Sequence, residues 1–396
     1  MAITKLTNTQ IKTIVNAAYK QFTGKDAIDS IDLSQFSDTG VADVAALRER
    51  FTGALIAQIT KNWYTDTSYR TEYKDVFFED STRFGQILQT ISATVPEVRD
   101  NSAWKSFATG DVVGTYVIAL PVIDTTYYAE TTSYALPITI TGQQWDDAFR
   151  DEAGLNDFVG YLFMMVDNAL VQHMEDLNNL NRNNYILSKQ LLRMQEAPGI
   201  HGVNLVKVWT DLKGITTGMT VEEFLTDKDA LTNGAETIGL YIGYMRKQTS
   251  LFNSAGKVRF TPEERVVVQL LDYFVKRFDS VVGANTFHNE LVQLPNYEAI
   301  PAWQNLHALD FDNISCVKGK PDSADSAITV NNVVGLVCDK WAIMHTTISK
   351  RVASQHFQIE DLTHYEYQFR DKYMNNMTMN GVFFFLADVA AEAGEG

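Results

Sequence analysis

One group of side chains has the types needed for acid–base or metal chemistry. His356, Asp361 and His364 lie close together in the sequence, on what reads as a loop between two strands. Two imidazoles and a carboxylate could bind zinc or transfer protons. Such a triplet is common by chance, so surface residues with no shared role explain it better than a functional site.

A second group lies near the end of a predicted long helix and contains His173, Glu175 and Asp176. Spacings of two and three residues converge poorly on one helix face, so a solvated helix end explains this group better than a metal site.

Motifs that usually accompany catalysis are absent from the sequence. There is no GxxxxGK[ST], no GxGxxG after a strand, no GxSxG, no HExxH and no EF-hand loop. The seven histidines never occur four residues apart. We therefore predict a protein that is not an enzyme, with no catalytic, metal-binding or cofactor-binding residues; an enzyme of unfamiliar sequence is the competing hypothesis.

Composition and charge restrict the partners of the chain. The 396 residues are 45% hydrophobic and carry a formal net charge of −16. This sign repels phosphate, so the whole chain is not expected to bind DNA tightly or to read its sequence. Four pairs of basic residues allow local contact with nucleic acid, but a solvated surface explains them better: Arg246–Lys247, Lys257–Arg259, Lys276–Arg277 and Lys350–Arg351.

The cysteines and the hydropathy pattern favour a protein of a reducing compartment. Cys316 and Cys338 have no CxxC partner and read as small buried hydrophobic residues. No stretch approaches the roughly 20 apolar residues of a membrane span, so no membrane partner is expected.

The first hundred residues are predicted to form an arm. Apolar residues recur at helical spacing after Thr7 and again from Val44 to Trp63. The tyrosine-rich segment 62–80 follows neither period and is predicted to be extended.

A projecting ribbon is predicted next. Residues 112–123 are rich in β-branched and aromatic residues, and residues 133–141 read as the returning strand. Pro121 and Pro137 place these two strands at an exposed edge.

The longest helix is predicted from Leu155 to Leu177, where apolar residues keep a 3.6-residue period. The asparagine-rich stretch 178–184 is predicted to end it.

A mixed lobe follows Pro198. The predicted elements are a strand at 203–212, an amphipathic helix at 235–252, a strand at 264–271 and a helix at 272–283 capped by Asp272. Thr261 and Glu264 fit a capping box that would make 264–271 helical instead, but the valine triplet favours a strand.

The last third is predicted to be mostly strands. Residues 333–349 read as two strands about a turn at 338–340, and Tyr365, Tyr367 and Phe369 alternate with polar residues in the next segment. A final apolar run at 381–390 would complete the sheet.

This order of elements resembles the HK97-type major capsid fold of tailed phages. The resemblance implies an α+β subunit with an N-terminal arm, a two-stranded E-loop, a long spine helix, a peripheral domain and an axial domain. The implied boundaries are 1–104 for the arm, 105–145 for the E-loop, 146–210 for the peripheral domain with its spine helix, 211–345 for the axial domain and 346–396 for the C-terminal peripheral-domain strands.

At the level of residues, the C-terminal third is similar to the major capsid proteins of short-tailed phages. The matching features are Asp339 with Trp341 between strands, Tyr365 and Tyr367 in a peripheral strand, and the apolar run Val382 to Leu386.

The resemblance implies a structural subunit of the virion, assembled in the host cytoplasm into an icosahedral head around packaged double-stranded DNA. Expected partners are further copies in hexamers and pentamers, a separate scaffolding protein, a portal, and DNA through non-specific contacts. Another virion component, such as a tail or collar protein, is the alternative. Candidates for inter-subunit contact are Tyr69, Tyr73, Tyr127, Tyr128 and Tyr134, for which ordinary packing within one chain is equally open.

Overall fold

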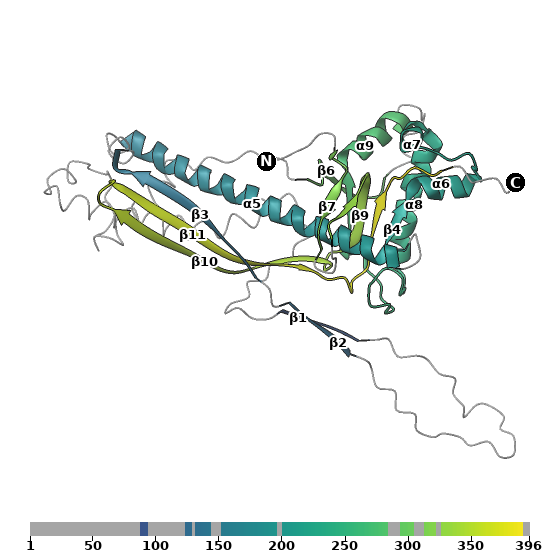
Figure 1. The fold of residues 1–396 in the computed structure, drawn as a ribbon, viewed down its shortest axis with the longest axis horizontal. Helices are drawn as coiled ribbons and strands as arrows, with labels where there is room; N and C mark the ends of the chain where they lie inside the picture. The colour runs from purple at the N-terminus through teal and green to yellow at the C-terminus, as the bar shows by residue number, and fades with distance from the viewer. Residues whose placement is uncertain are drawn as a thin grey trace, which may run out of the picture.

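The computed structural model describes residues 88–93, 123–128, 131–143, 152–195, 200–283, 294–304, 313–321 and 326–390. Figure 1 shows that they form an elongated arm, a lobe at one end of the arm, and a two-stranded hairpin that projects near the junction. This elongated arm is a different part of the chain from the N-terminal arm predicted for residues 1–104. The N-terminal helices and the extended segment predicted from the sequence, including Tyr69 and Tyr73, lie outside these residues.

The elongated arm consists of one helix lying along a three-stranded antiparallel sheet (Figure 1). The helix is α5 (Glu152–Gln195), and the sheet has the order β10 (Ile343–Phe357), β11 (Leu362–Asn375) and β3 (Thr132–Thr141). Tyr365, Tyr367 and Phe369 are all buried, as their predicted alternation requires.

The predicted strand 133–141 exists as β3, and its described partner is β11; residues 112–122 of the expected partner strand lie outside the described residues. Leu362 to Asp371 pair with β3, whereas Ile123, the described residue of the expected partner strand, pairs with Ala93. Pro137 lies at the edge of the described sheet, where a missing backbone donor is tolerated.

Helix α5 does not end at its asparagine-rich stretch but continues through it to Gln195. Asn181 donates a hydrogen bond to the carbonyl of Met344 (3.4 Å), and Asn183 donates one to the carbonyl of Trp303 (2.7 Å). These partners are distant in the sequence, so contacts with the sheet and the lobe override the weak helix propensity of asparagine.

The lobe contains a mixed five-stranded sheet in the order β4 (Gly202–Asn204), β12 (Gly381–Phe385), β9 (Val333–Asp339), β5 (Val266–Leu271) and β6 (Glu298–Ile300). The central strand β9 is antiparallel to both β12 and β5, and β4 and β6 pair in parallel with their neighbours.

Helices surround this sheet, and a small two-stranded sheet lies beside it. They are α6 (Leu205–Lys213), α7 (Val221–Thr226), α8 (Lys228–Met245), α9 (Asp272–Phe278), the 3-10 helix Glu263–Arg265, the π-helical turn Asp279–Gly283, β7 (Val317–Gly319) and β8 (Ile328–Val330).

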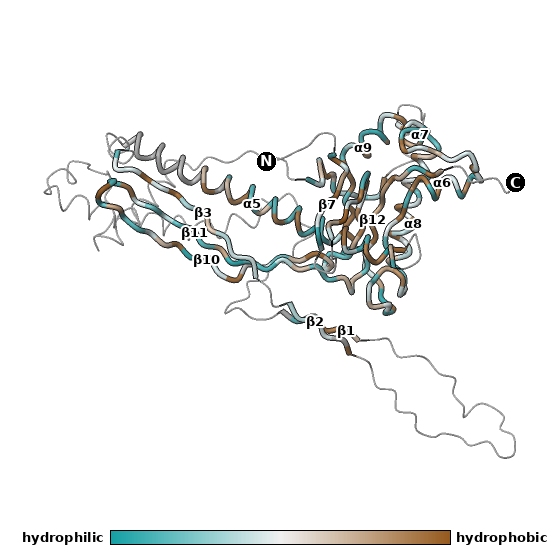
Figure 2. The backbone as a smooth tube through the Cα atoms, in the orientation of Figure 1, coloured by the Kyte–Doolittle hydropathy of each residue, from teal (hydrophilic) through white to brown (hydrophobic). Residues whose placement is uncertain are grey.

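Figure 2 shows that hydrophobic residues gather on the strands inside the lobe, and these residues form its core. Among the described residues, no helix is both long enough and apolar enough to cross a membrane.

Three local predictions in the lobe need correction. The predicted strand 203–212 is mostly helix α6, because the Asn204 side chain accepts a hydrogen bond from the Val206 amide and caps the helix. The predicted helix 235–252 begins earlier, after the N-cap Asp227, and ends at Met245. Asp272 is the first residue of α9 and makes no capping hydrogen bond.

The strand at 264–271 is confirmed over β5, and the capping-box alternative is wrong. The Thr261 hydroxyl accepts a hydrogen bond from the Asn380 side chain (3.3 Å), and Glu264 lies in the short 3-10 helix before β5. The last three predicted strands are confirmed as β10, β11 and β12, with β9 before them.

Candidate inter-subunit surface

The projecting hairpin consists of β1 (Leu88–Ala93) and β2 (Ile123–Tyr128), paired from Leu88 opposite Tyr128 to Ala93 opposite Ile123. Side chains alternate between the two faces of such a ribbon, and residues directly opposite each other share a face. Beside the polar residues Gln89 and Thr125, the register therefore places four residues on one face: Ile91, Ala93, Ile123 and Tyr127.

We call these four residues the apolar face of the hairpin. Ile91 is 66% exposed, Ile123 is 60% exposed and Tyr127 is 64% exposed. A lone two-stranded ribbon is marginally stable in water because it has nothing to cover its apolar side chains. This face is chemically suited to bury itself on a second surface.

The five candidate tyrosines are in different situations. Tyr69 and Tyr73 lie outside the described residues. Tyr127 is exposed on the apolar face, and Tyr128 is half-buried. Burial raises the pKa of the Tyr128 phenol, although a hydrogen bond with Thr90 opposes the shift.

Tyr134 makes contacts within its own chain. Its hydroxyl donates a 2.6 Å hydrogen bond to Asp371, and its ring stacks on Phe369 at 5.1 Å and touches the His173 ring at 4.3 Å. Burial and the neighbouring carboxylate of Asp371 raise the pKa of the phenol. Any role of Tyr134 between subunits stays a prediction.

Ile91 and Ile123 were not among the residues singled out from the sequence. The sequence pattern that could have indicated β1 is short, because Ile91 and Ala93 alternate with Thr90 and Ser92 in a strand of only six residues. Only the pairing of β1 with β2, two segments far apart in the chain, brings Ile91 and Ile123 onto one face.

The first histidine group does not converge. His356 lies opposite Thr363 and His364 lies opposite Gln355, so the two imidazoles project from opposite faces of the β10–β11 pair. His356 hydrogen-bonds to Thr363 (3.1 Å) and His364 to Thr139 (2.9 Å). Within the described part of the chain, no three histidine, cysteine, aspartate or glutamate side chains are grouped as a metal site would require.

In the second group, His173 packs on the ring of Tyr134 rather than facing a shared site with Glu175 and Asp176. All three side chains are half-buried on α5.

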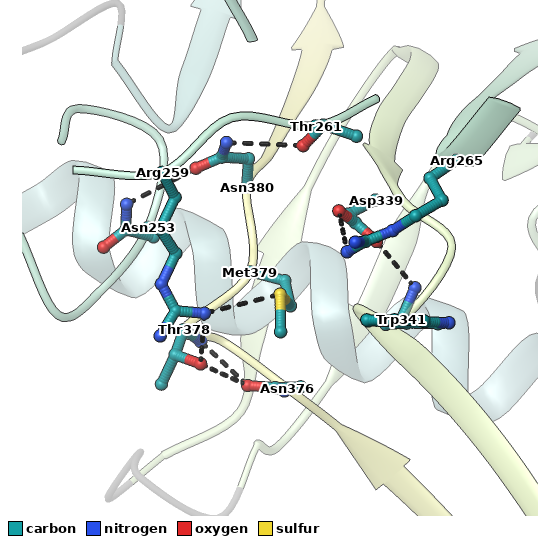
Figure 3. Close-up of polar contacts among 10 residues, drawn as sticks. All are labelled: Asn253, Arg259, Thr261, Arg265, Asp339, Trp341, Asn376, Thr378, Met379 and Asn380. Carbon is teal, nitrogen blue, oxygen red and sulfur yellow. Dashed lines mark hydrogen bonds and ion pairs between the residues drawn. The ribbon is translucent and has the colours of Figure 1, made fainter. Parts of the chain in front are cut away.

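A polar cluster lies where the lobe joins the arm (Figure 3). Arg265 donates two hydrogen bonds to the buried carboxylate of Asp339, at 3.1 Å and 2.5 Å, and its guanidinium lies 3.7 Å from the ring centre of Trp341. Asp339 also accepts a hydrogen bond from the Trp341 amide (2.9 Å). The predicted aspartate–aromatic pair is thus a cap for the turn between β9 and β10, held by a bidentate arginine.

The loop between β11 and β12 is held by a second set of contacts, also drawn in Figure 3. Asn380 donates to Thr261 (3.3 Å) and accepts from Asn253 (3.4 Å), and Arg259 contacts Thr378 (3.5 Å). These contacts connect the end of the arm sheet to the segment that follows α8.

A long helix along a narrow sheet, a mixed lobe and a projecting hairpin define a shell-forming subunit with the α+β, HK97-like capsid fold. The family model for the Phi29-like phage major capsid protein matches residues 11–385. The chain belongs to this family and is a structural capsid subunit of a phage.

Solved phage structures show similar chains at low identity. A chain from the structure of the head fibre and inner core protein of native bacteriophage P68 has 10% identity and a TM-score of 0.50, covering 80% of this chain and 84% of that chain. The capsid of Staphylococcus phage Andhra gives 11% identity and a TM-score of 0.46, covering 80% and 84%. The mature capsid of bacteriophage PhiM1 gives 9% identity and a TM-score of 0.45, covering 81% and 88%. No curated protein matches the sequence.

Proposed function

We propose that the chain builds an icosahedral head by burying the apolar face of its β1–β2 hairpin on a neighbouring copy. The single observation that carries this proposal is the gathering of three apolar side chains, each at least 60% exposed, on one face of a projecting ribbon. Their burial would contribute about 25 cal/mol for each Å² removed from water.

The proposed assembly consists of hexamers and pentamers of this chain, formed in the host cytoplasm with a scaffolding protein and a portal. The head would enclose double-stranded DNA and contact it without sequence preference. The net charge of −16 supports weak contact, because a wall of that sign does not hold the phosphate backbone tightly.

The proposed role is structural, without an enzymatic step. The opposite orientations of His356 and His364 support this view, since groups on opposite faces of a sheet cannot act on one substrate atom. We expect His364→Ala to leave assembly unchanged.

The test is a double substitution, Ile91→Ser with Tyr127→Ser, in the full chain expressed with its scaffolding protein. Size-exclusion light scattering and negative-stain electron microscopy should show shells for the original chain and unassembled subunits for the variant. Leu212→Ser is a matched control, because Leu212 on α6 is 64% exposed, as Tyr127 is. Normal shells from the double variant would refute the proposed role of the hairpin.

A further inference from the structure

Strand β11 has an inner face and an outer face as far as Asp371, and the pattern changes after it. Up to Asp371, residues at odd positions, such as Tyr365 and Tyr367, are buried. Glu366 and Gln368 on the outer face are partly exposed, and Arg370 is exposed. Lys372 and Met374 continue this outer row by alternation, yet they are only 0% and 4% exposed, and Lys372 is the charged residue of the two.

The Lys372 ammonium donates a hydrogen bond to a backbone carbonyl at the root of the hairpin, the end where β2 leaves it. Lys372 Nζ donates a 3.0 Å hydrogen bond to the backbone oxygen of Tyr128, the last residue of β2. Burial of an ammonium is costly unless its hydrogens are satisfied, so this contact specifies where the end of β2 lies against the sheet.

The adjacent residue of β11 holds the other side of the same connection. Asp371 is 2% exposed and accepts the 2.6 Å hydrogen bond from Tyr134, which lies near the start of β3. His345 Nε2 is 3.7 Å from the same carboxylate oxygen, and its ring stacks on Tyr373 at 4.6 Å.

The Lys372–Tyr128 and Asp371–Tyr134 hydrogen bonds hold the chain on either side of the connection between β2 and β3. Tyr128 is bound through Lys372 and Tyr134 through Asp371, and these two β11 residues are consecutive. Strand β11 is paired with a strand on each side, so it is a fixed support within the described sheet. A single contact would let the hairpin pivot, whereas contacts at both ends of the connection restrain its direction.

We infer that Asp371 and Lys372 are positioning residues that fix the direction in which the hairpin leaves its subunit. They orient the apolar face toward the neighbouring copy without themselves touching that copy. This inference rests on the proposed function, because direction matters for assembly only if the hairpin contacts another subunit.

The test measures the direction of the hairpin separately from assembly. Spin labels are attached at Gln89→Cys on the hairpin and Gln195→Cys at the end of α5, both exposed positions, in a Cys316→Ser background. Pulsed electron paramagnetic resonance on full-length unassembled subunits then gives the distribution of label distances. The substitution Lys372→Met keeps an unbranched side chain but removes the donor.

We expect Lys372→Met to broaden this distribution and to raise the population of displaced hairpins about tenfold, the effect of losing one charged hydrogen bond. Unchanged distances in Lys372→Met would overturn the inference, whatever happens to assembly. Broadened distances together with normal shells would support Lys372 as a positioning residue but would count against the hairpin as the inter-subunit contact.

A milder variant protects the test against misfolding. Tyr134→Phe keeps the ring stack on Phe369 and loses only the hydrogen bond to Asp371. We expect a smaller broadening than in Lys372→Met, with an unchanged circular dichroism spectrum. If Lys372→Met fails to fold and Tyr134→Phe keeps the original distances, the inference is wrong. The apolar-face variant Ile91→Ser with Tyr127→Ser should keep the original distances and fail only in assembly.

Discussion

At the scale of single residues, buried charges in this subunit mark joints between its parts. Asp339 links the start of β5 to the turn before β10 through Arg265, and Lys372 links the sheet to the hairpin root. Lys189, also fully buried, donates to the carbonyl of Phe252 at 2.8 Å. Asp339 has a charged partner, and the two lysines donate to backbone carbonyls; a buried charge without such a partner would strongly destabilise the fold.

The substitution Asp339→Asn should lower the free energy of unfolding by about 2–3 kcal/mol, because Arg265 would lose its charged partner while remaining largely covered. Urea denaturation followed by tryptophan fluorescence measures this change. The control is Asp211→Asn, which removes the exposed ion pair with Lys207 and should cost less than about 0.5 kcal/mol. Equal effects of the two substitutions would contradict the structural role of the Arg265–Asp339 pair.

The Cys338 thiol makes stability depend on alkaline pH. Burial, with a contribution from Asp339, raises the pKa of Cys338 to about 12 from an ordinary value of 9.0. The unfolded chain therefore loses this proton first, so the stabilising contribution is present below pH 9 and is lost as the pH rises toward 12. Thermal unfolding between pH 8 and 10 should show a shallower decline for Cys338→Ala than for the original chain; parallel declines would disprove the assignment.

At the scale of elements, strands with strong apolar alternation or continuous apolar runs were predictable, and their partners were not. The sequence correctly indicated β3, β5, β9, β11 and β12, because each carries its own pattern. The pairing of β3 with β11 joins residues more than 200 positions apart, and nothing in either segment specifies the other. The length of α5 was missed for a similar reason, since the partners of Asn181 and Asn183 lie elsewhere in the chain.

The candidate surface was predictable only in part. Tyrosine content drew attention to Tyr127, but the same argument selected Tyr134, whose hydroxyl is engaged within the chain. Composition cannot separate these two cases because exposure depends on which face of which strand pair a residue occupies.

Glycine positions give a matched test of how the elements pack. A Cβ atom at Gly381, in β12, would lie 2.1 Å from the hydroxyl of the fully buried Tyr185 on α5. Gly381→Ala should therefore lower the free energy of unfolding by about 1–3 kcal/mol. Gly239→Ala, on the exposed side of α8 where the new atom meets nothing, should raise it by about 0.5–1 kcal/mol. Chemical denaturation compares them, and a tolerated Gly381→Ala would show that β12 and α5 are packed less closely than described.

At the scale of the whole molecule, a net charge of −16 on each subunit opposes the gathering of many copies. Contacts between copies must outweigh that repulsion, and the apolar face of the hairpin is the contact that we propose. Salt screens repulsion between exposed charges while leaving apolar burial largely intact.

Assembly should consequently improve as salt is added. We expect the yield of shells to rise between about 50 and 300 mM sodium chloride, as the Debye length shortens. Light scattering of the full chain, with the proposed scaffolding protein added, follows this yield over time. A yield that falls with salt would mean that attractive ion pairs between copies dominate the interface.

The position of β12 in the lobe sheet also determines when a newly made subunit becomes usable. This strand, among the last described residues, lies between β4 and β9, so the sheet cannot close until it has been synthesised. A ribosome must translate nearly to residue 385 before the core of the lobe can form. A nascent chain that does not yet contain β12 therefore lacks a finished lobe sheet and has not reached the folded form of the subunit.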